Sequence, residues 1–214
     1  GIKNKNLKRI GKYTLIEYTL NFLKKVNLKK NFIYVSTDST KYLNSLKKFN
    51  LGSLLLRSKK NSKSNSKLED SIFEFLNHPL IKKQNFCFKY LILLLPTQPF
   101  RNHLLFKKAI NSIKNNTKSI ISIKNLDRSS DYIFKVNSDK IKIKKKLKST
   151  NRQFVKTNYT SCGCFYIIKF SEFIKHKSLF IPKSNYLISN FPDNIDIDSS
   201  EDLKIANLLY KNKN

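Results

Sequence analysis

The most apolar stretch of the chain reads Tyr90-Leu-Ile-Leu-Leu-Leu-Pro-Thr-Gln-Pro-Phe-Arg101. Its first six residues show no polar alternation, so we expect a central strand that is buried on both faces, as in a parallel sheet. The prolines that follow end this strand sharply. In open α/β sheets, ligands bind outside the carboxyl ends of the strands. The turn is therefore a candidate binding loop, in which Arg101 either contacts an anion or is a surface residue of a rigid turn.

Patterns of helix and strand alternate on both sides of this stretch. Apolar residues recur at helical spacing in 15–26, and β-branched and aromatic residues run together in 32–37, which predicts a helix followed by a strand. We further expect helices at 41–49, 67–77, 102–113 and 199–210, and strands at 54–56, 119–124 and 163–168. This alternation is typical of right-handed βαβ units and predicts an α/β sheet. The basic segment 133–147 alternates like a hairpin and could leave the sheet as an arm.

Polar residues mark the starts of three of these helices. Ser66 and Glu69 have the spacing of a capping box, in which each side chain bonds the backbone N–H of the other residue. Asn102 can cap the helix that follows the proline turn. The closing helix begins with Ser199 and carries acidic residues near its positive end.

Length and composition exclude several classes of protein. The 214 residues fit a single α/β domain, 1–214, and 40% of them are hydrophobic, which is enough for a core. No uninterrupted apolar run approaches the roughly 20 residues that cross a bilayer, so we expect no membrane partner. Three cysteines are too few for a disulfide scaffold, and no cleavable signal pattern opens the sequence, so we expect a cytoplasmic protein.

The net charge of +29 has two interpretations. The basic residues comprise 38 Lys and only 5 Arg, and they are spread along nearly the whole chain. A composition rich in lysine and poor in alanine is what AT-rich codons produce. A nucleic-acid-binding protein would need arginines clustered with aromatic residues on one face, and the sequence contains no such cluster. We therefore expect no nucleic-acid partner and keep nucleic-acid binding as the weaker alternative.

A pair of carboxylates stands out in a chain with only 14 acidic residues: Asn194-Ile-Asp-Ile-Asp198. Residues two apart in an extended segment point the same way, so Asp196 and Asp198 share one face while Ile195 and Ile197 enter the core. Two carboxylates just before a helix suit Mg²⁺ that is held together with substrate phosphates. The alternative is a solvated turn whose charges favour the helix dipole.

Two further segments have weaker signals. Cys162-Gly-Cys164 could bind a soft metal, but no second cysteine pair or histidine lies nearby, so reduced core thiols are the stronger interpretation. Residues 1–6 form a polar loop in which Lys5 is a candidate phosphate contact and Asn6 a candidate base contact. The sequence has neither a complete Walker loop nor a dinucleotide-binding glycine fingerprint.

The informative segments follow one another in the order Gly1-Ile-Lys-Asn-Lys-Asn6, Leu15-Ile-Glu-Tyr-Thr19, Val35-Ser-Thr-Asp38, Leu55-Leu-Arg57, Ser71-Ile72, Leu94-Leu-Pro-Thr-Gln-Pro-Phe-Arg101, Arg152-Gln153, Gly163-Cys-Phe-Tyr166 and Ile195-Asp-Ile-Asp198. In this order they resemble the acylneuraminate cytidylyltransferase family, the CMP-sialic acid synthetases and their relatives for similar nonulosonic acids. The resemblance covers essentially the whole chain.

The resemblance implies a three-layer, Rossmann-like nucleotidyltransferase sheet and a reaction. CMP would pass from CTP to the anomeric hydroxyl of a nine-carbon α-keto acid sugar, and pyrophosphate would leave. Lys5 would lie near the phosphates, and Asp196 and Asp198 would hold Mg²⁺, which offsets charge on the leaving group. These three residues are the candidate catalytic residues. Either a carboxylate or a metal-bound hydroxide could take the proton of the sugar.

The resemblance also assigns candidate binding residues. On the nucleotide side, Asn6 and Arg57 would contact the cytosine, Ser71 the nucleotide and Lys5 the phosphates. The segment 133–159 corresponds to the family's β-hairpin arm for dimerisation and sugar binding, so we expect a homodimer. The candidate sugar-binding residues are Gln98, Arg101, Arg152, Gln153 and Tyr159.

The sequence departs from the family pattern in three places. The family begins with a strand and a phosphate loop like I-P-A-R-G-G-S-K before the glycine that matches Gly1, and we expect the sequence to be a piece of a longer protein that has them. Leu95 and Cys162 replace a Gln and an Asn on the sugar side, and Gln98 could compensate. These departures keep one alternative open: a degenerate, non-catalytic relative that binds nucleotide or serves as a partner subunit.

Overall fold

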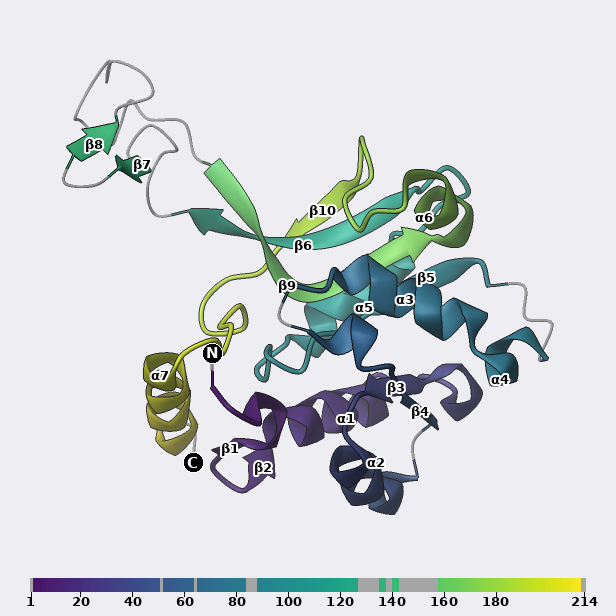
Figure 1. Cartoon of the computed structure of the whole chain (residues 1–214). Helices are drawn as coiled ribbons and strands as arrows, with labels where there is room; N and C mark the ends of the chain where they lie inside the picture. Colours follow the sequence, from purple (N-terminus) through teal and green to yellow (C-terminus); the bar gives the residue numbers. More distant parts are fainter. Residues whose placement is uncertain are drawn as a thin grey trace.

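The computed structural model of the protein describes residues 2–50, 52–63, 65–83, 88–126, 135–137, 140–142 and 158–212. Figure 1 shows a twisted sheet of long strands with helices packed around it. In the described ranges, none of the helices combines the length and the apolar character that crossing a membrane requires.

Helices and strands alternate along most of the described chain. The helices are α1 (Leu15–Lys25), α2 (Thr40–Leu46), α3 (Leu68–Asn77), α4 (Pro79–Lys82), α5 (His103–Asn111), α6 (Phe170–His176) and α7 (Ser200–Lys211). The strands are β1 (Arg9–Ile10), β2 (Tyr13–Thr14), β3 (Tyr34–Thr37), β4 (Ser53–Leu56), β5 (Tyr90–Leu93), β6 (Ser119–Leu126), β7 (Lys135–Asn137), β8 (Lys140–Lys142), β9 (Asn158–Lys169) and β10 (Asn185–Ile188). Short 3-10 helices include η1 (Lys5–Leu7) and η4 (Lys60–Ser62).

The main sheet is mixed rather than parallel. Its strands lie in the order β10-β6-β9-β5, with β10 parallel to β6 and with both β5 and β6 antiparallel to β9. The prediction of a central parallel strand at residues 90–95 is therefore wrong in position and direction: β5 is the last strand of this order and its residues are half-buried. An apolar run reports that both faces of a strand are covered, but it carries no signal for the direction of the neighbouring strand.

Helices cover both faces of this sheet and make three layers. On one face, α3 and α6 contribute Ile72 and Phe173 to a cluster with Tyr166 and Ile168 of β9. On the other face, α1 and α5 pack against β6 and β9 in a second cluster, whose buried members are Phe22, Phe106, Ala109, Ile120, Cys162, Cys164, Phe165 and Ile167. Burial of these apolar surfaces is the main force that holds the layers together.

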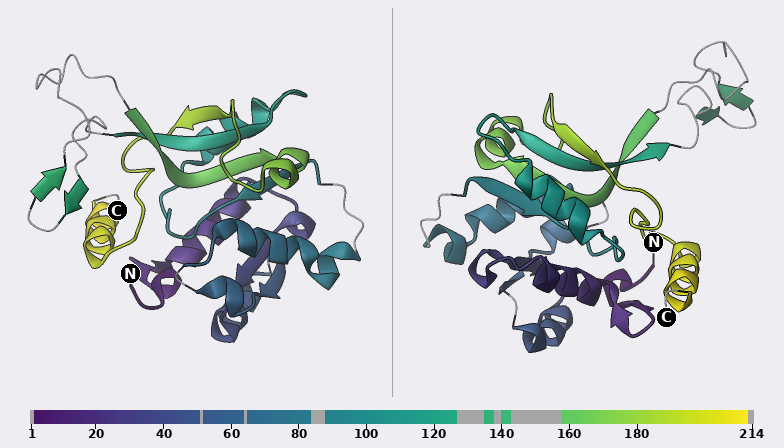
Figure 2. Two further views of the ribbon diagram at one scale, coloured as in Figure 1. Left: turned by 45° about the horizontal axis from the view of Figure 1, so that its top comes forward. Right: turned by 180° about the vertical axis from the view of Figure 1, so that it is seen from behind.

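A smaller parallel pair, β3 and β4, completes the core. Ile33 packs with Ile16, Leu20 and Leu23 of α1, and Leu94, just after β5, packs against the same cluster. Helix α7 lies beside β1 and β2 in both views of Figure 2. The segment that opens the chain, the end of β5 and the closing helix are therefore anchored to one another.

A β-bulge interrupts β9 at Gly163. The pairing with β6 shifts between Ile121 and Ile123, and Gly163 has φ +74°, a conformation that L side chains rarely adopt. The bulge changes the alternation of the strand, so that Cys164 and Phe165, although adjacent, both belong to the cluster under α1 and α5. The two cysteines of the Cys-Gly-Cys segment are buried and free, as expected for core thiols.

Two of the three expected helix caps are confirmed. Asn102 accepts hydrogen bonds from the backbone N–H groups of Leu104 and Leu105 at the start of α5. Ser199 caps α7 in a capping box with Asp202. The capping box predicted at Ser66 is wrong, because α3 begins after Lys67 and the Ser66 hydroxyl donates to the carbonyl of Lys60 instead.

The expected hairpin is present in the part of its segment that the structure describes. Strands β7 and β8 pair antiparallel, with Val136 opposite Ile141. They lie away from the three layers in Figure 1. The role of residues 133–159 as a dimerisation arm stays a prediction, since most of them lie outside the described residues.

Candidate functional site

Asp196 and Asp198 lie on the extended segment that links β10 to α7. Ile197 between them is fully buried, and its backbone N–H donates to the carbonyl of Thr97 at 2.9 Å. Ile195 packs against the same apolar cluster as Ile197. The prediction that the isoleucines face the core is confirmed. Asp198 is exposed, whereas Asp196 is half-buried against the turn that follows β5.

Asp196 has the properties of a cation ligand. Its carboxylate is half-buried, and its Oδ1 is inaccessible to solvent and has no hydrogen-bond partner among the described residues. Burial raises the pKa of Asp196, and a hydrogen bond with Thr97 and the charge of Lys5 offset this only in part. A buried, unpaired carboxylate oxygen is unfavourable unless a cation or a donor meets it. The site therefore fits a metal ion that completes its ligand shell with other oxygens.

Lys5 meets this carboxylate pair from the other end of the sequence. Its Nζ lies 2.7 Å from Oδ1 of Asp198, a contact between residues 193 positions apart. The Lys5 side chain is 25% exposed and that of Asp198 71% exposed, so the pair opens to solvent on the aspartate side. Lys5 belongs to η1. Leu7 of the same 3-10 helix packs against the cluster that contains Ile33 and the α1 residues. The predicted grouping of Lys5 with the two aspartates is present in the structure.

The side chain of Asp202 fixes the backbone at Asp198 through hydrogen bonds. The Asp202 carboxylate accepts hydrogen bonds from the backbone N–H groups of Asp198 and Ser199, at 3.0 and 2.8 Å. Burial raises the pKa of Asp202, but these hydrogen bonds outweigh it and lower the pKa below the usual value. Asp202 therefore acts behind the site by holding the turn into α7.

Gln98 is fully buried next to the bulge in β9. Its Nε2 has no hydrogen-bond partner among the described residues, and its Oε1 accepts from the Cys164 thiol at 3.5 Å. The turn that carries it is closed by a bond from Gln98 N–H to the carbonyl of Leu95 at 3.2 Å. Gln98 thus has an unused amide donor, but the side chain is fully buried, and its contact with the sugar stays a prediction.

Arg101 is an interior residue rather than a surface one. Its Nε donates to the carbonyl of Cys164, its Nη2 to the carbonyl of Leu95 at 2.7 Å, and its Nη1 to the Thr19 hydroxyl at 3.5 Å. The guanidinium also lies over the ring of Phe22. Burial lowers the pKa of Arg101 to about 10, so the side chain is charged at neutral pH. Since each nitrogen already donates to the protein, Arg101 supports the loop from behind, and the alternative of a surface arginine is wrong.

A second group of candidate residues surrounds the end of β4. Arg57 directly follows this strand, and its Nη2 lies 4.0 Å from Oδ1 of Asp38, which follows β3. Ser71, at the start of α3, donates from its hydroxyl to the carbonyl of Asn61 at 3.3 Å. The loop between β4 and α3 therefore carries Arg57 and rests on Ser71. The predicted nucleotide-binding residues Arg57 and Ser71 share one loop-and-helix unit.

The other predicted site residues are less constrained. Asn6 is half-buried on η1, next to Lys5. Tyr159 lies near the start of β9, opposite Asn125, and its side chain is exposed. Arg152 and Gln153 lie outside the described residues.

Sequence reasoning missed Thr97 and Asp193. Thr97 contacts the carboxylate segment through its carbonyl and its side chain. Asp193 accepts a hydrogen bond from Asn102 Nδ2 at 2.7 Å, which ties the start of α5 to the same segment. The signal for Thr97 was its place between two prolines at a strand end, where a hydroxyl is presented by a rigid backbone. Asp193 had no local signal, because its partner lies 91 residues away.

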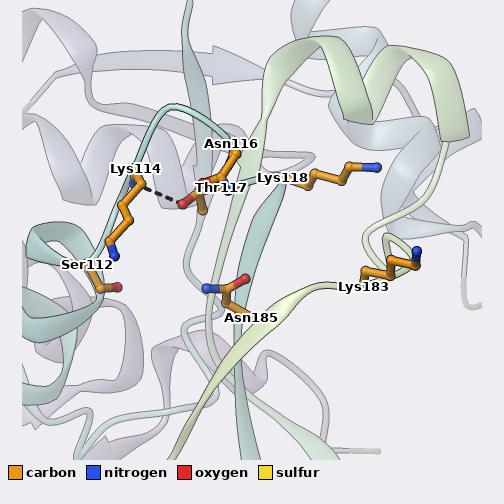
Figure 3. A pocket seen from close by; sticks show the side chains of 7 residues that line it. All are labelled: Ser112, Lys114, Asn116, Thr117, Lys118, Lys183 and Asn185. Atoms are coloured by element: carbon orange, nitrogen blue, oxygen red, sulfur yellow. Dashed lines mark hydrogen bonds between the residues drawn. The ribbon is translucent and has the colours of Figure 1, made fainter.

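A cavity of about 670 Å³ lies at the opposite end of the sheet, where β6 and β10 begin (Figure 3). Its lining includes Lys114, Lys118 and Lys183, whose side chains point in different directions in the figure. Lys118 also lies 4.0 Å from Glu172. In a chain with 38 lysines, several lysines near one cavity are expected by chance, so their presence does not indicate a binding site. The site of Lys5, Asp196 and Asp198, at the carboxyl ends of β5 and β10, is the stronger candidate.

Comparison with known proteins identifies a matching family and one curated relative. A family model described as "Cytidylyltransferase" matches residues 1–212. Post-translational flagellin modification protein B from Campylobacter coli is 25% identical over 219 residues, which cover 100% of this chain and 91% of that protein.

Two solved structures show the fold. A CMP:2-keto-3-deoxy-manno-octonic acid synthetase complexed with CTP has a TM-score of 0.67 at 11% identity and covers 100% of this chain and 94% of its own. A 4-diphosphocytidyl-2C-methyl-D-erythritol synthase from Anaerococcus prevotii has a TM-score of 0.63 at 18% identity, with 95% and 88% covered. The expected Rossmann-like, three-layer architecture is confirmed by this likeness.

Proposed function

The chain belongs to the cytidylyltransferase family, and we propose that it transfers CMP from CTP to the anomeric hydroxyl of a sialic-acid-like nonulosonic acid and releases pyrophosphate. The observation that carries this proposal is the grouping of Lys5, Asp196 and Asp198 at the turn after β5. A relative named for flagellin modification and a neighbour whose acceptor is a keto sugar acid support an acceptor of this class.

The two carboxylates would hold Mg²⁺. The buried, unpaired Oδ1 of Asp196 and the exposed carboxylate of Asp198 supply oxygens of the kind that this ion prefers. Two protein ligands leave most of the coordination shell to phosphate oxygens and water. When bound, Mg²⁺ would offset the charge that develops on the leaving pyrophosphate.

Lys5 would neutralise phosphate oxygens at the same place. Its Nζ lies 2.7 Å from Oδ1 of Asp198, so the phosphate oxygens of a Mg²⁺-bound nucleotide at the aspartates would lie within its range. Arg57 and Ser71 would hold the nucleotide at the end of β4, together with Asn6 beside Lys5. Gln98 and Tyr159 would contact the sugar, and Arg101 would act through the loop that it supports.

Release of pyrophosphate with CTP and candidate nonulosonic acids is the direct assay. We expect turnover with CTP and Mg²⁺ and much less with ATP or GTP. Asp196→Asn should lower kcat by about 100-fold or more, because it removes a charged ligand of the Mg²⁺ that would offset the charge on the leaving pyrophosphate. The fold should persist, since burial disfavours the charged form of this carboxyl.

The matched control is Glu201→Gln, which removes one charge from an exposed position on α7. This variant should keep the activity of the parent protein. Equal turnover with all nucleotides would contradict the role of Arg57 and Asn6. Binding of CTP without any pyrophosphate release would favour the non-catalytic relative instead.

A further inference from the structure

We propose that Glu74 is a positioning residue for nucleotide recognition: its carboxylate fixes the loop that presents Arg57. The inference rests on the proposed function, because it assigns Glu74 a role toward the cytosine of CTP. Glu74 lies on α3, one turn after Ser71, and its side chain faces the loop 57–63 that precedes this helix.

One carboxylate organises this loop through three hydrogen bonds. Glu74 Oε1 accepts from the backbone N–H of Ser58 at 2.5 Å. Its Oε2 accepts from the Ser58 hydroxyl at 2.8 Å and from Asn61 Nδ2 at 2.5 Å. Burial raises the pKa of Glu74, but these bonds and the charge of Arg57 outweigh it and lower the pKa. The carboxylate is therefore ionised and acts only as an acceptor, as the three donors require.

The loop that Glu74 fixes also positions the side chain of Arg57. The Ser62 hydroxyl donates to the carbonyl of Ser58 at 2.7 Å, and the same hydroxyl accepts from Arg57 Nε at 3.1 Å. Arg57 N–H also donates to the carbonyl of Thr37 at 2.7 Å, which continues the pairing of β3 with β4. These contacts fix the Nε edge of the guanidinium, while its Nη2 lies 4.0 Å from Oδ1 of Asp38.

The helix that carries Glu74 is anchored in the core. Ile72 is 5% exposed and belongs to the cluster with Phe173 and Ile168 under the sheet. Ser71 on the same helix holds the loop at a second point, the carbonyl of Asn61. A loop of seven residues is thus fixed to a rigid helix at two residues, Ser71 and Glu74, and Glu74 accepts three of the four hydrogen bonds.

Glu74→Gln tests this role with little change in volume. Glutamine has one acceptor oxygen and one NH₂ group, so it cannot accept at both positions, and its NH₂ faces a donor of Ser58 or Asn61. We expect the KM for CTP to rise about 10-fold, the factor that corresponds to one lost hydrogen bond to a charged group, with kcat within about twofold of the parent. The preference for CTP over UTP should fall as well.

Two controls separate positioning from charge and from folding. Asp70→Asn removes one negative charge from an exposed position of the same helix and should leave the KM for CTP unchanged. In an Arg57→Ala background, Glu74→Gln should have no further effect on the KM, because the two residues act through one contact. Amide hydrogen exchange of residues 57–63 should become faster in Glu74→Gln and stay unchanged in Asp70→Asn.

The outcomes distinguish this inference from the proposed function. If the parent protein releases pyrophosphate from CTP and Glu74→Gln has the same KM, the positioning role is wrong and the proposed function stands. The same conclusion follows if Glu74→Gln and Asp70→Asn raise the KM equally. If the parent protein neither binds nor turns over CTP, both are overturned, whatever the exchange rates of the loop.

Discussion

The charged guanidinium of Arg101 is buried, and its three nitrogens donate to three separate parts of the chain. The acceptors are the carbonyl of Leu95 after β5, the carbonyl of Cys164 in the bulge of β9, and the hydroxyl of Thr19 on α1. A planar guanidinium with a fixed fork of donors can satisfy such a set, whereas an ammonium group acts as a point charge. The residue therefore joins a loop, a strand and a helix at the base of the site.

Replacing Arg101 by Lys should destabilise the protein by about 2–4 kcal/mol. The substitution keeps the charge but leaves buried acceptors unpaired, and each unpaired acceptor costs about 1–3 kcal/mol. Urea unfolding followed by circular dichroism measures the change. Arg9→Lys is the control, since Arg9 is exposed and its side chain donates to the nearby carbonyl of Lys12. Equal stabilities of the two variants would contradict the interior role of Arg101.

The site residues differ in how far the sequence could predict them. The spacing of Asp196 and Asp198 around Ile197 was enough to predict a shared face, because alternation is a local property of an extended chain. The contact of Lys5 with Asp198 joins residues 193 positions apart, and no local pattern reports it. For Arg101 the sequence showed a charge after a turn but not the carbonyls that surround it. Its interior place therefore had to come from the structure.

At the scale of elements, the helices were more predictable than the sheet. Apolar residues at helical spacing in α1, and the caps at Asn102 and Ser199, follow from contacts within one or two turns. The order and direction of the strands depend on pairings between distant segments, such as β5 with β9. The false capping box at Ser66 has a similar cause, since its Glu69 accepts instead from the backbone of Leu179.

The start of α1 makes the stability of the protein depend on pH. Glu17 forms a capping box with Thr14, and its Oε1 lies 3.1 Å from Nζ of Lys48. Burial raises the pKa of Glu17, but these bonds outweigh it and lower the pKa below the usual 4.5. A depressed carboxyl pKa contributes stability above the unfolded value of 4.5, and this contribution is lost as the pH falls through the folded value.

We therefore expect the free energy of unfolding to fall below pH 4.5, and to fall less steeply in Glu17→Gln. Glutamine keeps the reciprocal bond of the capping box but has no charge to titrate. Urea unfolding of both proteins at several values between pH 3 and pH 6 gives the comparison. Asp70→Asn, on an exposed face of α3, serves as control. Parallel pH dependences of the parent and Glu17→Gln would contradict the assignment.

For the whole molecule, the excess of 43 basic over 14 acidic residues acts on the compact state. Like charges repel one another more strongly when the chain is folded, and salt screens them. The screening length shortens from about 30 Å at 0.01 M salt to about 10 Å at 0.1 M. The ion pairs among the described residues are too few to balance a net charge of +29.

The melting temperature should accordingly rise when NaCl increases from about 0.01 M to about 0.1 M. Differential scanning calorimetry measures the change, and an uncharged osmolyte of equal osmolarity separates screening from solvent exclusion. A melting temperature that falls with salt would mean that attractive ion pairs dominate repulsion. The expected direction follows from composition, so it required no structure.

The contact between Lys5 and Asp198 has a consequence for timing in the cell. The two residues are 193 positions apart, and ribosomes add about 5–20 residues per second. Lys5 therefore leaves the ribosome roughly 10–40 s before the aspartate that it meets. During that interval the nascent chain can fold its early helices, but the proposed phosphate site lacks Asp198. If the proposed function holds, a product whose synthesis stops before Asp198 is inactive, and turnover begins only after translation has passed this residue.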